Sequence, residues 1–278
     1  MGNLRACLVV AISALAAACG DDGGGNVVAD ASIDSAPDAE IFMDAPPPMF
    51  DLACIGNSAP NNAPADIDLS GSAQIVDGSI LNIMINPIDM AQINVCTTTA
   101  CTGNPPSDDS DAAGDWAVPA VATTNTMGLL NGYLELTKTG VRTTFVYPGV
   151  PFTADQADIP ILVFGAGILP ILSNAGCDAN EPIMAVAVAD CANTPITDTA
   201  NVNIVVKQGG NPVAGVQVTD LSTLPGVPPQ VAGLFLVCNV PANAATNIGA
   251  TYNGMTLLAH DVKTVNSTTT TTLVRPGY

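Results

Sequence analysis

The sequence predicts an all-β protein built from two tandem antiparallel β-sandwich modules, and three observations carry this prediction. Apolar and polar residues alternate at period two, turn residues punctuate the chain about every ten residues, and a glycine–aromatic pattern recurs in the two halves. We expect the modules at residues 65–175 and 176–278. A signal peptide at 1–18 and a disordered tether with a lead-in segment at 19–64 precede them.

The expected strands follow from local composition. Residues 133–136 and 143–147 are rich in β-branched and aromatic side chains, which favour strands. Residues 165–175 have the composition of one short helix, which we expect Pro170 to break. The alternation is clearest at Ile67, Leu69, Gly71, Ala73, Ile75, Ile93 and Val95.

The first nineteen residues carry an export pattern. Arg5 is followed by a run of apolar and small residues from 6 to 18, and then by Cys19. The segment resembles a bacterial lipoprotein signal peptide, although Leu15 stands four residues before Cys19 instead of the usual three. The resemblance implies a lipid on Cys19 that anchors an exported protein in the cell envelope, and we expect the outer membrane. Simple cleavage after residue 18 is the alternative.

The segment from Gly20 to about Phe50 reads as a tether. It holds three consecutive glycines at 23–25, scattered acidic residues and three prolines at 46–48. Such a segment has too little apolar surface to offset its loss of chain entropy on ordering, so we expect it to be disordered.

The charge excludes nucleic acid as a partner. The chain has 6 Lys and Arg against 25 Asp and Glu, and removal of Arg5 with the signal takes its net charge from −19 to −20. No basic residue lies between Arg5 and Lys138. A protein of this charge repels phosphate backbones.

The cysteines fit an oxidising compartment. The chain has 8, and six remain once Cys7 and Cys19 are set aside. We expect disulfides, with Cys96 joined to Cys101 across a short loop. Elimination then leaves two further pairs, and metal binding is disfavoured because the chain has 1 histidine. Those further expected pairs are Cys191 with Cys238 and Cys54 with Cys177.

A repeat indicates two copies of one module. Gly114 and Trp116 in the first half match Gly233 and Phe235 in the second, and a valine follows each aromatic residue by five positions. About 100 residues per copy suffice for a sandwich core.

Several of these positions resemble carboxypeptidase regulatory-like domains, which are prealbumin-like sandwiches. Residues 87–95 look like the P-V-x-G-A-x-V-x-V opening of that family, and residues 111–116 like its T-D-x-x-G-x-aromatic turn. In the second half, residues 190–196 resemble its D-x-x-G-x-P-V turn and 239–241 its N-V-P step. Met90 and Asp198 replace glycines of the pattern, and Ser110 replaces a threonine.

A second phase of the pattern begins at Gly210 and is similar to that of invasin-type Ig-like domains, so the register of the second module stays open. The resemblance implies domains that are non-catalytic parts of exported proteins.

The residues themselves disfavour an enzyme, and no cofactor is expected. His260 is the single histidine, and no G-x-S-x-G nucleophile motif occurs. A peptidase zinc site therefore lacks ligands. A glycosidase-type carboxylate pair stays open at this point, although most acidic residues lie in the tether and turns.

One acidic cluster is site-like. Asp108, Asp109, Asp111 and Asp115 crowd a turn that resembles a Ca²⁺ site in its oxygen content. The EF-hand pattern fails, because alanines occupy ligand positions. We favour an exposed hairpin turn in which Asp111 caps the bend and Gly114 supplies positive φ, with Ca²⁺ as the alternative.

The expected function is that of a non-enzymatic, membrane-anchored lipoprotein whose sandwich modules are structural or interaction domains. Its partners are the membrane, through the N-terminal lipid, and an envelope protein or polysaccharide. The alternatives are a carbohydrate-binding surface protein, which the shortage of aromatic residues disfavours, and a Ca²⁺-stabilised adhesin-like module.

Overall fold

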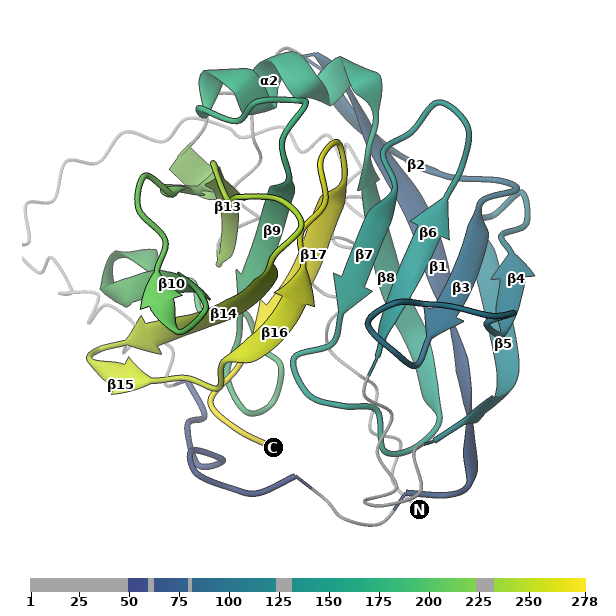
Figure 1. Ribbon diagram of the computed structural model, residues 1–278, viewed down its shortest axis with the longest axis horizontal. Coiled ribbons are helices and arrows are strands. Elements are labelled where there is room, and N and C mark those ends of the chain that lie inside the picture. The colour runs from purple at the N-terminus through teal and green to yellow at the C-terminus, as the bar shows by residue number, and fades with distance from the viewer. Residues whose placement is uncertain (1–49, 60–62, 80–81, 124–131, 224–232) are drawn as a thin grey trace, which may run out of the picture.

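The computed structural model describes residues 50–59, 63–79, 82–123, 132–223 and 233–278, so the signal peptide and most of the tether lie outside these ranges. The described chain is all-β, with a few short helical segments (Figure 1). The first module consists of β1 (Asp66–Ser79), β2 (Asn82–Pro87), β3 (Gln92–Cys96), β4 (Ser107–Asp109), β5 (Asp115–Ala122), β6 (Tyr133–Thr137), β7 (Thr144–Tyr147) and β8 (Gln156–Phe164).

A short 3₁₀ turn, η3 (Ala166–Ile168), and the helix α2 (Leu169–Asn174) link the first module to the second. The second module consists of β9 (Ile183–Val188), η4 (Thr199–Asn201), β10 (Val202–Gln208), β11 (Asn211–Pro212), β12 (Gln217–Asp220), η5 (Leu221–Thr223), β13 (Leu234–Cys238), β14 (Ala245–Tyr252), β15 (Met255–Thr256), β16 (His260–Lys263) and β17 (Thr269–Val274).

Each module is a sandwich of two sheets around its own core. In the first module, β2, β1, β5 and β8 face β4, β3, β6 and β7. In the second, β12, β13, β9 and β17 face β11, β10, β14, β15 and β16. Trp116, Val118 and Val121 of β5 are buried in the first core, and a shift in the β1–β5 register between Val118 and Val121 interrupts the period-two alternation. The second core is formed from residues between 184 and 274, so the two inner cores lie on either side of residue 175.

The sequence predicts antiparallel sandwiches, but each module also contains one parallel strand pair. In each module the first strand pairs parallel with the last: β1 with β8, and β9 with β17. A parallel neighbour needs a long crossover connection, and the whole intervening module supplies it.

The glycine–aromatic motif of the first module has a defined backbone environment. Gly114 accepts a hydrogen bond from the Ala73 amide at 2.8 Å, and Ala73 accepts one from the Ile88 amide at 3.1 Å. Trp116 then lies opposite Gly71 in the β1–β5 pair, with its side chain in the first core.

The second module repeats this arrangement. Gly233 accepts from the Val188 amide at 3.0 Å, and Val188 accepts from the Ile196 amide at 2.8 Å. Phe235 lies opposite Val186 and is buried in the second core. These contacts match those of the first module position by position. Residues 195 and 196 of the second module are therefore equivalent to residues 87 and 88 of the first. Gly210 belongs instead to the turn between β10 and β11.

The two modules join edge to edge through parallel pairing of β7 with β17, at Thr144 with Thr269 through Tyr147 with Thr272. This pairing fuses one sheet of each module into a single eight-stranded sheet, in which β17 lies beside β7 (Figure 1). The boundary near residue 175 therefore separates the inner cores but not the sheets.

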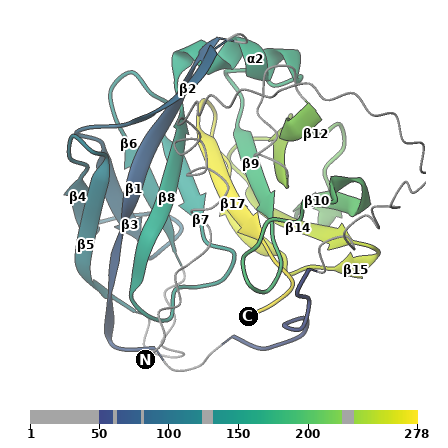
Figure 2. The same cartoon turned by 180° about the vertical axis from the view of Figure 1, so that it is seen from behind.

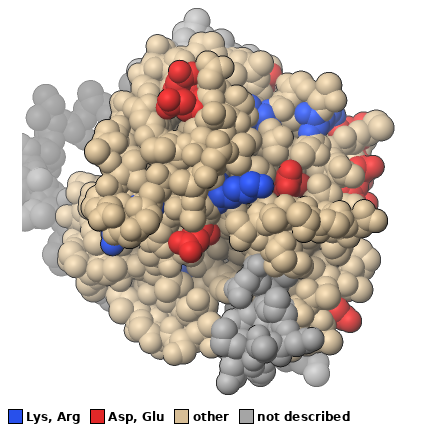
Figure 3. Space-filling model, viewed as in Figure 1, with Lys and Arg blue, Asp and Glu red and all other residues tan. Residues whose placement is uncertain are grey.

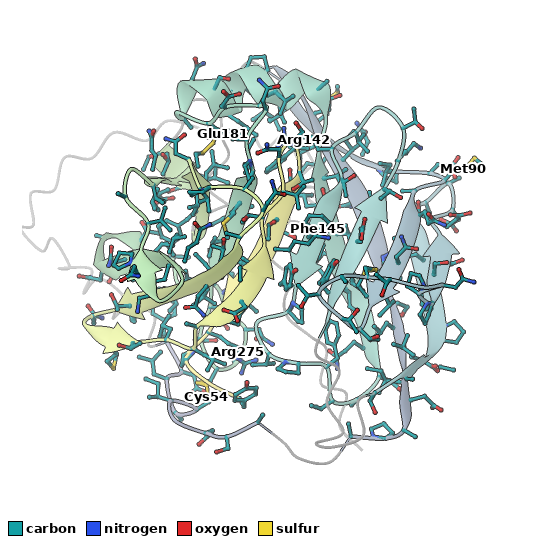
Figure 4. The ribbon with its side chains drawn as sticks, in the orientation of Figure 1. Cys54, Met90, Arg142, Phe145, Glu181 and Arg275 are labelled. Atoms are coloured by element: carbon teal, nitrogen blue, oxygen red, sulfur yellow. A yellow bond between two sulfur atoms is a disulfide. The ribbon has the colours of Figure 1, made fainter. Side chains whose placement is uncertain are left out.

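Arg142 adds a side-chain latch across the same boundary. Its guanidinium donates to the backbone carbonyls of Ala179, Glu181 and Thr268, all in the second half of the chain. Figure 4 shows Arg142 pointing toward the segment that carries Glu181. Burial lowers the pKa of Arg142 from its usual value, but arginine is effectively always protonated in proteins.

The helix α2 covers the ends of both modules (Figure 2). Pro170 stands in the first turn of α2, where backbone amides have no hydrogen-bond partner within the helix, so the missing amide hydrogen of proline is not a loss there. The expectation that Pro170 breaks the helix is therefore wrong, because Pro170 lies at its beginning. A shared cluster under the helix takes residues from both modules, including Val76, Phe164, Leu172 and Leu236. Because this cluster covers the outer side of β9, almost every β9 side chain is buried.

Candidate functional site

A groove with a volume of about 700 Å³ lies between the two modules. The first module contributes Thr99, Tyr133 and residues 147–151, and the second contributes residues 243–245, 258–265 and Tyr278. Its volume is within the usual range for small-molecule sites. Figure 3 shows that the face of the molecule seen there is mostly uncharged, with a few scattered acidic and basic side chains.

An aromatic cluster forms the wall of the groove that belongs to the first module. Tyr133 and Tyr147 stack with their ring centroids 4.9 Å apart, and Phe145 meets Tyr133 edge to face at 5.6 Å. Lys263 of β16 places its ammonium 4.8 Å from the Phe145 centroid and 5.7 Å from that of Tyr133. The Lys263 amide also donates to the Tyr147 hydroxyl at 3.0 Å. These contacts hold β16 against the first module.

Tyr133 and Tyr147 are poor acid–base groups. Burial, together with the nearby Glu135 carboxylate, raises the pKa of Tyr133 to about 12. Burial also raises the pKa of Tyr147, against the opposing effect of the Lys263 amide. Both phenols are therefore neutral at physiological pH and serve as hydrogen-bonding and packing groups.

His260 lies in the groove wall as a neutral imidazole. Burial lowers its pKa to about 4, and the Asp261 charge offsets only part of that effect. Its Nε2 is 2.6 Å from the Thr272 hydroxyl, and its buried Nδ1 has no hydrogen-bond partner among the described residues. Because no carboxylate of the described residues hydrogen-bonds to the His260 ring, the group that would orient a catalytic-triad histidine is missing in the described chain.

The described residues bring one group of metal-type ligands together: Cys96, Cys101 and Glu135, whose ligand atoms lie within 4.8 Å of one another. Both cysteines belong to a disulfide, so their sulfurs are not thiolates and cannot serve as thiolate ligands. The carboxylates expected as a Ca²⁺ alternative do not converge in this way.

The acidic cluster instead forms the expected turn. Asp111 accepts hydrogen bonds from the Ala113 and Asp115 amides at 2.8 and 2.9 Å, and Gly114 has φ +82°. Asp108 accepts from the amide of residue 117 at 2.8 Å, and Asp109 ends the exposed strand β4. One carboxylate oxygen of Asp108 and one of Asp111 therefore accept hydrogen bonds from backbone amides.

The same turn recurs at Asp190. Its Oδ1 accepts from the Ala192 and Thr194 amides at 2.9 and 2.8 Å, and Asn193 has φ +63° where Gly114 stands in the first turn. The sequence resemblance marked Asp190, but the role of Asn193 was missed. Asparagine tolerates positive φ better than most other non-glycine residues, so the place of Asn193 in this turn could have been predicted from its residue type.

The disulfides agree with the sequence analysis in one pair and differ in two. Cys96 is joined to Cys101, as expected. The remaining pairs are Cys54 with Cys191 and Cys177 with Cys238, in place of the pairs reached by elimination. Elimination failed because sequence spacing does not show which cysteine of the second module lies beside Cys54. Cys19 lies outside the described residues.

Comparisons with known proteins identify no family for this chain. No protein-family model matches the chain, and no curated protein matches its sequence. A type II cohesin–X-dockerin complex from Acetivibrio cellulolyticus is 19% identical over 38% of this chain and 72% of that chain, with a TM-score of 0.25. The shaft pilin SpaA from Lactobacillus rhamnosus GG is 10% identical over 77% of this chain and 98% of that chain, with a TM-score of 0.23. Likenesses this low carry no argument about activity or partners.

Within the described ranges, none of the helices has the length and apolar character needed to span a membrane.

Proposed function

We propose that the chain is a non-enzymatic lipoprotein of the bacterial cell envelope, anchored in the outer membrane by Cys19, whose two sandwiches act together as one structural and interaction unit. The observation that carries the proposal is the junction between the modules. A shared sheet, a shared apolar cluster and the Arg142 latch hold the modules together, while the groove between them has binding dimensions but no catalytic constellation among the described residues.

The backbone supports the carboxypeptidase regulatory-like character that the sequence suggests. Met90 stands where that pattern has glycine, and its φ is +50°, a conformation that favours glycine. Asp198 at the corresponding place of the second module has φ −79° and gives no such support.

Lipidation is the part of the proposal that one experiment decides. Cells producing the chain should incorporate labelled palmitate into it, and globomycin should make the precursor accumulate. A Cys19→Ser variant should show neither effect and should leave the membrane fraction. Normal processing in globomycin with no incorporated label would refute a lipid anchor.

A saccharide-binding role is the second candidate, and the position of two tyrosines favours it. Trp116, Tyr133 and Tyr252 are buried, whereas the half-buried Tyr147 and Tyr278 both line the groove. Aromatic rings beside polar groups are typical of sites for small ligands. A glycan array with the wild type and an Asp261→Asn variant tests this role, since Asp261 is the carboxylate of the groove wall. Equal signals from the two proteins would place any binding elsewhere.

A further inference from the structure

The residues that precede the first module bind to the second module. We call residues 50–57 the N-terminal strap. The Phe50 ring meets the Tyr252 ring edge to face at 5.7 Å. The backbone pairs as well, because the Asp51 amide donates to Asp190 Oδ2 at 3.0 Å and the Cys191 amide donates to the Asp51 carbonyl at 2.7 Å.

A disulfide joins the strap to the second module. Cys54 forms a disulfide with Cys191, with 5.7 Å between their Cα atoms and a sequence separation of 137. The next residue, Ile55, forms a β-bridge with Gly277. A Cβ on Gly277 would lie 2.0 Å from the Cys54 carbonyl oxygen, so only glycine fits there. Figure 4 shows Cys54 beside Arg275 at the C-terminal end of the chain.

This connectivity places the whole first module inside one disulfide loop. β1 to β8 and α2 all lie between Cys54 and Cys191 in sequence. The second disulfide adds another crossing, from Cys177 inside that loop to Cys238 in β13. The covalent path from the strap to Tyr278 therefore needs no residue of the first module.

We propose that the strap is a mechanical bypass, by which tension applied at the N-terminal segment enters the second module at Cys191 and leaves the first module unloaded. The path runs through the Cys54–Cys191 bridge, back along the chain to Cys177, and through the Cys177–Cys238 bridge to Tyr278. The lipid anchor of the proposed function would fix the N-terminal end of this path, but the bypass does not depend on it. Tension between the tether and the C-terminal end of the chain is then carried by the second module, and the covalent path does not pass through the first module.

Single-molecule stretching tests the bypass on the mature chain, with handles at its two ends in place of the lipid. A Cys54→Ser/Cys191→Ser variant puts about 100 more residues into the stretched path, which adds roughly 35 nm of extension at about 3.4 Å per residue. The matched control, Cys96→Ser/Cys101→Ser, removes a disulfide that lies inside the bypassed loop and should extend no further than the wild type.

Adding a reductant to the folded wild type gives the same test without a substitution, and its full extension should then exceed that of the oxidised protein. Equal extension of the oxidised wild type and the Cys54→Ser/Cys191→Ser variant would overturn the bypass. Because the stretched chain carries no lipid, this outcome says nothing about Cys19, and a failure of the lipidation test leaves the stretching result intact.

Discussion

At the scale of single residues, a positive φ angle marks a position where glycine would fit the backbone better than the residue that is present. Met90 has φ +50° and is 74% exposed, so its side chain contributes little to packing. Left-handed backbone costs a non-glycine residue about 1 kcal/mol.

Met90→Gly should therefore stabilise the protein by about 0.5 to 1 kcal/mol in urea unfolding, because glycine adopts this backbone without strain. Met84 is a matched control, since it is also exposed but lies within strand β2. Met84→Gly should be destabilising, because glycine weakens a strand. Equal losses from both substitutions would show that φ at residue 90 carries no strain.

His260 makes stability depend on pH in one window. Its folded pKa is lowered to about 4, whereas the unfolded value is near 6.5. Between these values the unfolded chain binds the extra proton, so the contribution of His260 is fully present above pH 6.5 and is lost as the pH falls toward about 4.

The thermal midpoint of the wild type should thus fall across this window more steeply than that of a His260→Gln variant, which cannot titrate but keeps polar atoms for the Thr272 hydroxyl. Parallel pH profiles for the two proteins would contradict the burial of a neutral imidazole at this position.

At the scale of elements, the Arg142 latch joins the loop before β7 to the two loops that flank β9 and β17. Arg142→Ala removes a charged donor from three carbonyls, and hydrogen bonds from charged groups contribute about 1.5 to 3 kcal/mol each without being additive. We expect a loss of about 2 to 3 kcal/mol in urea unfolding.

Lys138→Ala is the control for this substitution, because Lys138 also donates to a backbone carbonyl, that of Asp89, but within its own module. It should cost less than 1 kcal/mol, as exposed surface contacts do. A similar loss from both variants would mean that Arg142 acts only as a surface charge.

The strands were largely predictable because their signals are local. Alternation at Ile93 and Val95 and the β-branched stretch at 143–147 correspond to β3 and β7. The interface was not predictable, because the pairing of β7 with β17 joins residues more than 120 positions apart, and period-two alternation says nothing about which edges meet. Likewise, the groove depends on Tyr147 and Lys263, which no short motif connects.

At the scale of the whole molecule, the structure combines two repeats with one connected scaffold. The glycine–aromatic repeat could be found from sequence because Gly114 and Gly233 meet the same backbone positions in each module. A repeat of this kind would by itself allow each module to fold separately. The eight-stranded sheet and the shared cluster under α2 argue instead for one cooperative unit, since neither module can unfold without exposing surface of the other.

The last prediction decides between these two behaviours. Phe235 is 5% exposed in the second core, and a buried phenylalanine cut to alanine loses about 3 to 5 kcal/mol. The chain has 1 tryptophan, Trp116, which is buried in the first core and reports on that module alone. We expect Phe235→Ala to lower the unfolding midpoint seen by Trp116 fluorescence and by far-UV circular dichroism to the same extent.

The reason is that loss of the second core removes the partner of β7 and half of the shared cluster. Leu136→Ala in the first core is the reciprocal variant, with the tryptophan retained, and it should likewise shift both signals together. If Phe235→Ala instead produced an early change in circular dichroism while the Trp116 transition kept its wild-type midpoint, the two sandwiches would be independent folding units, and their common sheet would form only after each had folded.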